Sequence, residues 1–248
     1  MTATTTKLKC LNGTALKLIA MALMLCDHMW ATVVPGALWL TYIGRLAFPI
    51  FAFQVAEGYA HTKNFKRYLL RMFLFALISE IPFNLMAGGG ILYPFHQNVM
   101  FTFCIALLMM RLMDTVREKH WALRLLMAAV CVLLGAFVGL ITFVDYFGYG
   151  VVMVLVFHLF RDVRWGWLAQ LAAMIFINGF LMKGMTFPLT LFGVTMDFPQ
   201  QALAVLALIP IWLYNGERGP GGKAMQYIGY AFYPVHMLIL ALLWLYVI

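Results

Sequence analysis

Long apolar runs, separated by charged residues, glycine or proline, repeat along the whole chain. A helix needs about 20 mostly apolar residues to cross a bilayer, and most of the runs approach that length. The pattern predicts an all-α polytopic membrane protein with about nine transmembrane helices, forming a single integral membrane domain over residues 1–248. The run at 146–160 is short, so it could enter the membrane only partly. The predicted helices cover residues 14–34, 38–61, 66–86, 98–113, 121–142, 146–160, 165–183, 199–214 and 224–247.

The composition narrows the class of protein. Hydrophobic residues make up 65% of the chain and charged residues only 10%, against about 25% charged residues in soluble domains. These values exclude a disordered chain, a coiled coil and an ordinary water-soluble enzyme. The net charge of +8 would suggest a nucleic-acid partner for a soluble protein. In a membrane protein it has a simpler cause, because cytoplasmic loops collect Lys and Arg. We therefore expect membrane lipid, and no nucleic acid, as a partner.

The positions of the basic residues predict the orientation. If the N-terminus is cytoplasmic, every Lys and Arg lies on the cytoplasmic side except Arg45, inside a predicted span, and Lys183, near an outer loop. This is a strong positive-inside pattern. We expect a multi-pass protein of a bacterial-type inner, or cytoplasmic, membrane.

Four charged residues lie inside the predicted spans, where a charge at the helix centre costs at least about 2.5–3.5 kcal/mol. They are Asp27, Arg45, Glu57 and Glu80. Such residues face the bundle interior, pair with each other or line a water-filled site. By depth, Arg45 could pair with Asp27 or with Glu80, whereas Glu57 lies near the cytoplasmic end of its helix. A functional role and a purely structural ion pair both remain open.

Two histidines reach the middle of the membrane. His28 lies about 16 Å beyond Lys17 along the first helix, on the same face. Asp27 is on the adjacent face and could orient the imidazole only indirectly. His236 is at a similar depth in the last helix, where it could instead be a hydrogen-bonded packing residue. Histidine is the side chain best suited to take and return a proton near neutral pH.

Basic and polar residues cluster where the second predicted helix ends and the third begins. Two interpretations compete: a loop that faces anionic lipid headgroups, and a phosphate-binding patch at a helix N-terminus. The residues concerned are His61, Thr62, Lys63, Asn64, Lys66, Arg67 and Arg71. No metal site is expected, because the four cysteines are widely spaced and form no CxxC pattern.

Several segments resemble the TraX family, the family of the conjugative F-pilin N-acetyltransferase. The resemblance runs from the first helix to the last, and its most specific part is Asp-His late in the first helix followed by Gly-Arg-x-Ala-Phe-Pro in the second. The matching segments are LKLIAMALMLCDHMWA (16–31), GRLAFPIFAFQVAEGYAHTKN (44–64), RYLLRMFLFALISEIPFN (67–84), QNVMFTF (97–103), WLYNGERG (212–219) and YIGYAFYPVHM (227–237).

The order of features is also similar to the wider superfamily of transmembrane acyltransferases, with His28, Arg67 and Arg71, and Tyr233 with His236 as the counterparts. The resemblance implies transfer of an acyl group, usually acetyl, from cytoplasmic acyl-CoA. Basic residues at the rim, Lys17 among them, would hold the phosphates of acetyl-CoA. His28 would act as general base or carry the acyl group itself. The candidates for orienting the base are Asp27 and Glu57, and those for stabilising the oxyanion are Arg45, Gln97, Asn98 and His236.

The acceptor stays open at this stage. It could be the N-terminal amine of an exported peptide or pilin, or a hydroxyl or amine of a lipid-linked glycan. Two other classes of function compete with the enzyme. A small proton- or cation-coupled transporter could use Asp27, Glu57 and Glu80 as a relay, and a non-enzymatic scaffold of an envelope assembly would need neither histidine.

Overall fold

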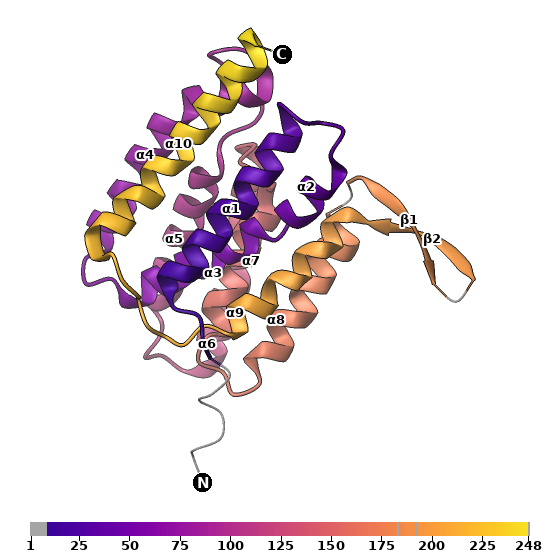
Figure 1. Cartoon of the computed structure of the whole chain (residues 1–248). Helices are drawn as coiled ribbons and strands as arrows, with labels where there is room; N and C mark the ends of the chain where they lie inside the picture. The colour runs from indigo at the N-terminus through magenta and orange to yellow at the C-terminus, as the bar shows by residue number, and fades with distance from the viewer. Residues whose placement is uncertain (1–8, 183, 192, 248) are drawn as a thin grey trace.

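The computed structural model describes residues 9–182, 184–191 and 193–247; Lys7 and Lys183, two of the basic residues counted above, lie outside the described residues. Each predicted apolar run contains helix (Figure 1). The helices are α1 (Gly13–Ala31), α2 (Leu38–Gly44), α3 (Ala47–His61), α4 (Phe65–Gly88), α5 (Val99–Asp114), α6 (Trp121–Ile141), α7 (Phe147–Leu159), α8 (Gly166–Ile175), the π-helix η1 (Phe176–Leu181), the 3-10 helix η2 (Gln200–Ala207), α9 (Leu208–Trp212) and α10 (Gly222–Tyr246).

Five helical segments are long and apolar enough to cross a membrane. They are α1, α2 and α3 taken together (Leu38–His61), α4, α6 and α10. The other helical segments are shorter. The chain is therefore a largely helical membrane protein with five candidate spans, and the remaining crossings among the nine stay predictions.

The second predicted span is interrupted, which the apolar pattern did not indicate. The chain leaves the helix at Arg45 and Leu46, between α2 and α3. Pro49 explains the position, because proline has no N–H and its ring clashes with the carbonyl four residues earlier, which is that of Arg45. At the end of α2, a Cβ on Gly44 would lie 2.4 Å from the Cβ of Asp27. The glycine thus lets α2 lie directly against α1.

The structure also differs from the predicted all-α fold by a β-hairpin in the predicted outer connection. Strands β1 (Thr186–Leu191) and β2 (Val194–Pro199) pair antiparallel, with Leu189 opposite Met196. Both strands contain threonine and phenylalanine, and β2 begins with Val194; these residue types favour strands. The hairpin projects from the helices at the tip of α8–η1 and η2–α9 (Figure 1).

The helices pack around a buried centre formed largely by α7. The side chains of Val151, Met153, Val154 and Leu155 are fully buried, while α4 and α10 lie side by side at one edge of the bundle (Figure 1). In contrast α6 exposes Leu125 and many other large apolar residues. A helix surface that is apolar outside as well as inside is suited to lipid rather than water.

The bundle has two distinct ends, named here for what they carry. The basic end holds the starts of α1, α4 and α10, the end of α3, and the loop 213–221. The hairpin end holds the end of α1, the loops 89–98 and 142–146, and the β-hairpin. At the basic end Leu11 forms backbone hydrogen bonds with Leu213 and Asn215, and Gly13 donates to the Glu217 carbonyl at 2.8 Å. These bonds fix the loop 213–221 against the start of α1.

Candidate functional site

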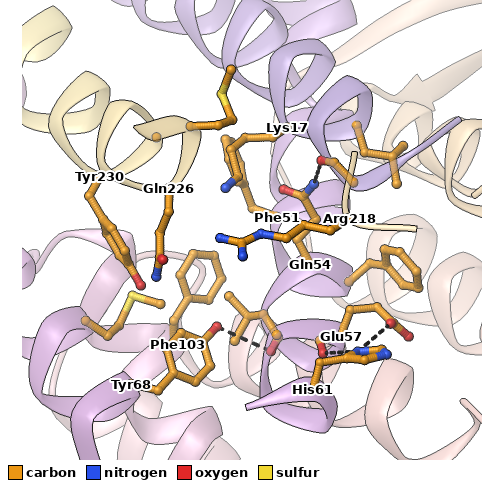
Figure 2. Close-up of a pocket in the computed structure, with 18 of the residues that line it drawn as sticks. Lys17, Phe51, Gln54, Glu57, His61, Tyr68, Phe103, Arg218, Gln226 and Tyr230 are labelled. Carbon is orange, nitrogen blue, oxygen red and sulfur yellow. Dashed lines mark hydrogen bonds and ion pairs between the residues drawn. The ribbon is translucent and has the colours of Figure 1, made fainter. Parts of the chain in front are cut away.

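A cavity of about 610 Å³ opens at the basic end between α1, α3, α4, α10 and the loop 213–221. We call it the basic-end cavity. Figure 2 shows its charged and polar side chains turned toward a common space, with Lys17 and Arg218 on one side and Tyr68 and Tyr230 on another. The lining also includes Gln54, Glu57, His61, Lys63, Arg71 and Gln226.

Four cations line this cavity: Lys17 from α1, Lys63 from the loop before α4, Arg71 from α4 and Arg218 from the loop 213–221. Within the described ranges none of them forms an ion pair. Lys17 lies over Gly229 of α10, where a Cβ would approach the lysine Cδ to 3.0 Å. The glycine therefore leaves room for the lysine side chain beside α10.

Two buried polar atoms of the lining have no hydrogen-bond partner among the described residues: Oε1 of Gln54 and Nε of Arg71. Burying a polar group without a partner costs about 1–3 kcal/mol. A cavity with unpaired cations and unsatisfied polar atoms is suited to an anionic, hydrogen-bonding ligand.

The structure divides the predicted phosphate patch. Lys17, His61, Lys63 and Arg71 line the cavity, whereas Asn64, Lys66 and Arg67 do not. Asn64 caps α4, accepting a hydrogen bond from the Arg67 N–H at 2.9 Å. Lys66 and Arg67 are exposed on the first turn of that helix, where they remain candidates for contact with lipid headgroups.

Sequence reasoning did not single out Arg218, Gln54, Gln226 or Tyr230 as site residues. Arg218 did carry a signal, because it lies in the glycine-flanked segment WLYNGERG that contributed to the family resemblance. The other three are ordinary polar or aromatic positions of α3 and α10, and only the packing of those helices against α1 and α4 brings them to the cavity.

Glu57 lies at the cavity rim and is already paired. Its Oε1 accepts a hydrogen bond from Arg161 Nε at 2.7 Å, and its Oε2 lies 3.3 Å from His61 Nδ1. The arrangement ties the end of α3 to the loop that follows α7. Glu57 lines the basic-end cavity and not the cavity that contains His28.

A second cavity, of about 480 Å³, occupies the hairpin end, and we call it the hairpin-end cavity. Its polar lining comes from α1, from the break between α2 and α3, from the loops 89–98 and 142–146, from η2 and from α10. The polar residues are Asp27, His28, Arg45, His96, Asp145, Tyr146, Gln201 and Tyr233.

Asp27 forms a salt bridge with Arg45, which was one of the two pairings that depth allowed. The same carboxylate accepts a hydrogen bond from Thr41 Oγ1 at 2.7 Å, and Thr41 in turn accepts one from Gln200 Nε2 at 2.8 Å. Asp27 thus joins α1 to α2 and η2, and these contacts direct it away from the neighbouring imidazole.

Glu80, the other possible partner of Arg45, is bound by Asn98. The Asn98 side-chain amide donates to Glu80 at 2.5 Å and to the Ala76 carbonyl at 2.8 Å, and the same residue caps α5. Gln97 donates to the Pro94 carbonyl at 3.0 Å and lines neither cavity. Asn98 and Gln97 therefore hold the loop and the start of α5.

His28 of α1 and His236 of α10 contact each other edge to edge. His28 Nδ1 lies 2.7 Å from His236 Nε2, and the ring planes are 6° apart. His236 Nδ1 lies 2.6 Å from the Phe232 carbonyl oxygen. His236 is 5% exposed and lines neither cavity, while His28 lines the hairpin-end cavity.

The two cavities meet at a layer of five side chains that line both of them. We call this the shared layer, and it consists of Met24, Phe51, Val99, Phe103 and Tyr233. Along α1, Lys17 lies in the first cavity, Met24 in the shared layer and His28 in the second cavity, about one helical turn beyond Met24. The Tyr233 hydroxyl accepts a hydrogen bond from the Val99 N–H at 3.4 Å.

The part of the chain that the structure describes contains no group of three or more His, Cys, Asp or Glu side chains that could hold a metal ion.

Comparison with known proteins identifies the family. The model of the TraX protein family matches residues 12–244. The chain belongs to the TraX family. The match confirms the resemblance found in the sequence, and it includes both cavities, the shared layer and both histidines.

A curated relative of this TraX chain is the probable fimbrial assembly protein FimC, serogroup H1, of Dichelobacter nodosus. The two are 27% identical over 242 residues, which covers 91% of this chain and 92% of the relative. No solved structure matches the chain.

Proposed function

We propose that the protein is a membrane-embedded acetyltransferase. It moves an acetyl group from acetyl-CoA in the basic-end cavity to an acceptor in the hairpin-end cavity, with His28 as general base. The observation that carries this proposal is the meeting of two cavities from opposite ends of the bundle at one shared layer, with His28 one turn beyond it. Donor and acceptor could thus approach from opposite sides and react at the layer between them.

The donor side is supported by charge. Acetyl-CoA has phosphates at one end and a thioester at the other, joined by a long flexible arm. Lys17, Arg71 and Arg218 would bind the phosphates, and Gln54 and Tyr230 offer hydrogen bonds to the arm as it descends toward the shared layer. This orientation requires the basic end to face the cytoplasm, in agreement with the positive-inside pattern.

The chemistry requires a base and an oxyanion donor. The ring nitrogen of His28 that does not contact His236 would take the proton of the acceptor as its nitrogen or oxygen attacks the thioester carbonyl. The new acyl bond forms, the C–S bond breaks, and the protonated His28 gives its proton to the departing CoA sulfur, which leaves as the thiol. Tyr233 lines both cavities, so its hydroxyl can donate a hydrogen bond to the oxyanion between them.

The acceptor is an amine or hydroxyl presented at the hairpin end. The name of the Dichelobacter nodosus relative, a fimbrial assembly protein, favours the N-terminal amine of a pilin-type peptide over a glycan. A transporter is less well supported. Asp27 pairs with Arg45, Glu57 with Arg161, and Glu80 accepts from Asn98, so none of the three carboxylates is free to relay a proton.

The proposal predicts that the purified protein in nanodiscs transfers labelled acetyl from acetyl-CoA to a peptide amine, detected by mass spectrometry. His28→Ala should lower kcat by about 10²–10⁴-fold. Arg218→Gln should raise KM for acetyl-CoA but not for S-acetylpantetheine, which lacks the nucleotide phosphates. Arg164→Gln, which removes an exposed cation outside the basic-end cavity, is the matched control. Full transfer by His28→Ala, or equal effects of Arg218→Gln on both donors, would contradict the mechanism.

A further inference from the structure

The proposed base needs one ring nitrogen free of hydrogen, and the contacts around His28 determine which one. The chain of contacts begins at the Phe232 carbonyl, which lies 2.6 Å from His236 Nδ1. A carbonyl oxygen has no proton to give, so Nδ1 of His236 must be the donor. In the neutral ring, His236 Nε2 is then an acceptor.

His28 completes the chain. Its Nδ1 lies 2.7 Å from His236 Nε2, and the nearly parallel ring planes allow an edge-to-edge hydrogen bond. Because His236 Nε2 accepts, His28 Nδ1 must carry the hydrogen and donate it. Nε2 of His28 is then the nitrogen with the free lone pair.

We propose that His236 is a positioning residue. Its Nδ1–H donates to the Phe232 carbonyl and its Nε2 accepts from His28, which fixes His28 in the tautomer whose Nε2 can accept a proton. The inference rests on the proposed function, because the tautomer matters for a general base. His236 does not touch the reacting atoms, since it is buried and lines neither cavity.

The contacts of Asp27 explain why a histidine takes this part. A carboxylate commonly orients a catalytic imidazole, and Asp27 is the neighbour of His28 in sequence. However, Asp27 is bound to Arg45 and Thr41 of the α2 side of the bundle. The orienting group instead comes from α10, so the base reaches its active tautomer only when α10 is packed against α1.

Two substitutions of His236 separate this role from a structural one. The amide oxygen of His236→Gln can take the place of Nε2 and keep an acceptor for His28. The amide nitrogen of His236→Asn takes the place of Nδ1, keeping the bond to the Phe232 carbonyl but losing the acceptor. We expect His236→Gln to retain most of kcat. We expect His236→Asn to lower kcat by on the order of 10–100-fold, as loss of an orienting partner does, with KM for acetyl-CoA unchanged.

A higher kcat for His236→Asn than for His236→Gln, or full activity of both variants, would overturn the proposal. Either result would mean that His236 serves only to pack the helices or to satisfy the Phe232 carbonyl. His158→Gln is the matched control, since it replaces a half-buried histidine of α7 that contacts Asp114 and not His28.

A second measurement does not depend on catalysis or on the folding of the His236 variants. In ¹⁵N-histidine-labelled wild-type protein, the resonances of His28 are assigned by their loss in His28→Ala. We expect Nδ1 of His28 to be protonated and Nε2 not; the reverse assignment overturns the inference. If His28 has this tautomer but the protein transfers no acetyl group, the proposed function is wrong, while the hydrogen bond from His28 to His236 is confirmed.

Discussion

Asp27 and Arg45 are opposite charges held within apolar segments, at the point where α2 ends against α1. Each side chain is about one-fifth exposed, and Thr41 provides a further hydrogen bond to the carboxylate. Among the described residues neither charge forms another ion pair. The pair therefore contributes to stability mainly by preventing a lone buried charge.

Removing the Asp27 charge should be costly. We expect Asp27→Asn to lower the free energy of unfolding by about 3–5 kcal/mol, because Arg45 is left uncompensated. Replacing both residues together, as Asp27→Asn with Arg45→Met, should restore much of the loss. Asp162→Asn removes an exposed partner of Arg161 and should change stability by less than about 1 kcal/mol. Unfolding titrations in detergent measure all three, and equal effects of the two Asp→Asn changes would show that Arg45 does not depend on Asp27.

At the residue scale, the sequence predicted how far along its helix a residue lies, but not which residue it pairs with. A rise of 1.5 Å per residue puts His28 and His236 at similar depths, and the two rings do contact each other, although His28 lies in the last turn of α1 and not at its middle. The same arithmetic leaves Asp27 and Glu80 as equal partners for Arg45. The choice follows from Gly44, which lets α2 approach Asp27, and from Asn98, which binds Glu80. Neither contact has a local pattern in the sequence.

Helices α6 and α7 pack closely because glycines face each other across their contact. A Cβ on Gly148 would lie 2.2 Å from the Ala136 carbonyl oxygen, and one on Gly139 would lie 2.9 Å from the Phe147 carbonyl oxygen. Small residues allow the backbones of membrane helices to approach in this way. The exposed, lipid-suited α6 is thereby held against the buried α7.

A methyl group at this contact should separate the two helices. We expect Gly148→Ala to lower the free energy of unfolding by at least about 1–3 kcal/mol, because the obstructing atoms are backbone and cannot rotate away. Gly179→Ala is the control, because nothing lies within 4 Å of a Cβ there. The control should leave stability unchanged or raise it by up to about 1 kcal/mol, since alanine favours helix over glycine. If both substitutions lowered thermal stability equally in detergent, the close contact would not be the cause.

At the element scale, helix positions were predictable because apolar runs must satisfy their backbone internally when they lie in lipid. The break at Arg45 and Leu46 had a signal, Pro49, that the long apolar run concealed. The hairpin at Thr186–Pro199 was missed for a different reason: its residues lie in a connection, where the apolar pattern gives no period to follow. The close packing of α6 and α7 at Gly148 depends on which residues face the glycine, and these cannot be predicted from the sequence.

The hairpin end of the whole molecule is held together by two loops. Gln97 forms two backbone hydrogen bonds with the other loop: its N–H donates to the Phe143 carbonyl and its carbonyl accepts from the Asp145 N–H, both at 2.8 Å. His96 Nε2 lies 3.3 Å from Asp145 Oδ1. This hydrogen bond raises the pKa of His96 above its ordinary value of 6.5, against the opposing effect of partial burial, and Asp145 and Glu80 add electrostatic support.

The pair should make the stability of the whole chain depend on pH. A histidine whose folded-state pKa is raised stabilises the fold fully below pH 6.5 and loses that contribution as the pH rises through the folded-state pKa. We expect the Tm of the wild type to fall as the pH rises above 6.5. His96→Gln should flatten that part of the curve. His120→Gln, at a histidine that forms no ion pair among the described residues, should leave it unchanged; a wild-type slope retained in His96→Gln would refute the assignment.

For the molecule as a whole, the sequence predicted a basic rim and a mid-membrane histidine, but not two cavities. Lys17 and His28 share one face of α1, which is a local property. Arg218, Gln54 and Tyr233 complete the cavities from helices and loops far away in sequence. Their convergence depends on the crossing of α1, α4 and α10, which apolar periodicity does not determine.

The shared layer also bears on the energy supply of a cell. Four of its five side chains, Met24, Phe51, Val99 and Phe103, are wholly apolar, and the fifth is the single hydroxyl of Tyr233. Such a layer offers ions almost nothing to replace their hydration. An acetyl group could be transferred across this layer because it stays covalently bound, whereas protons and sodium ions would not pass through it. A membrane containing many copies would therefore keep its proton-motive force.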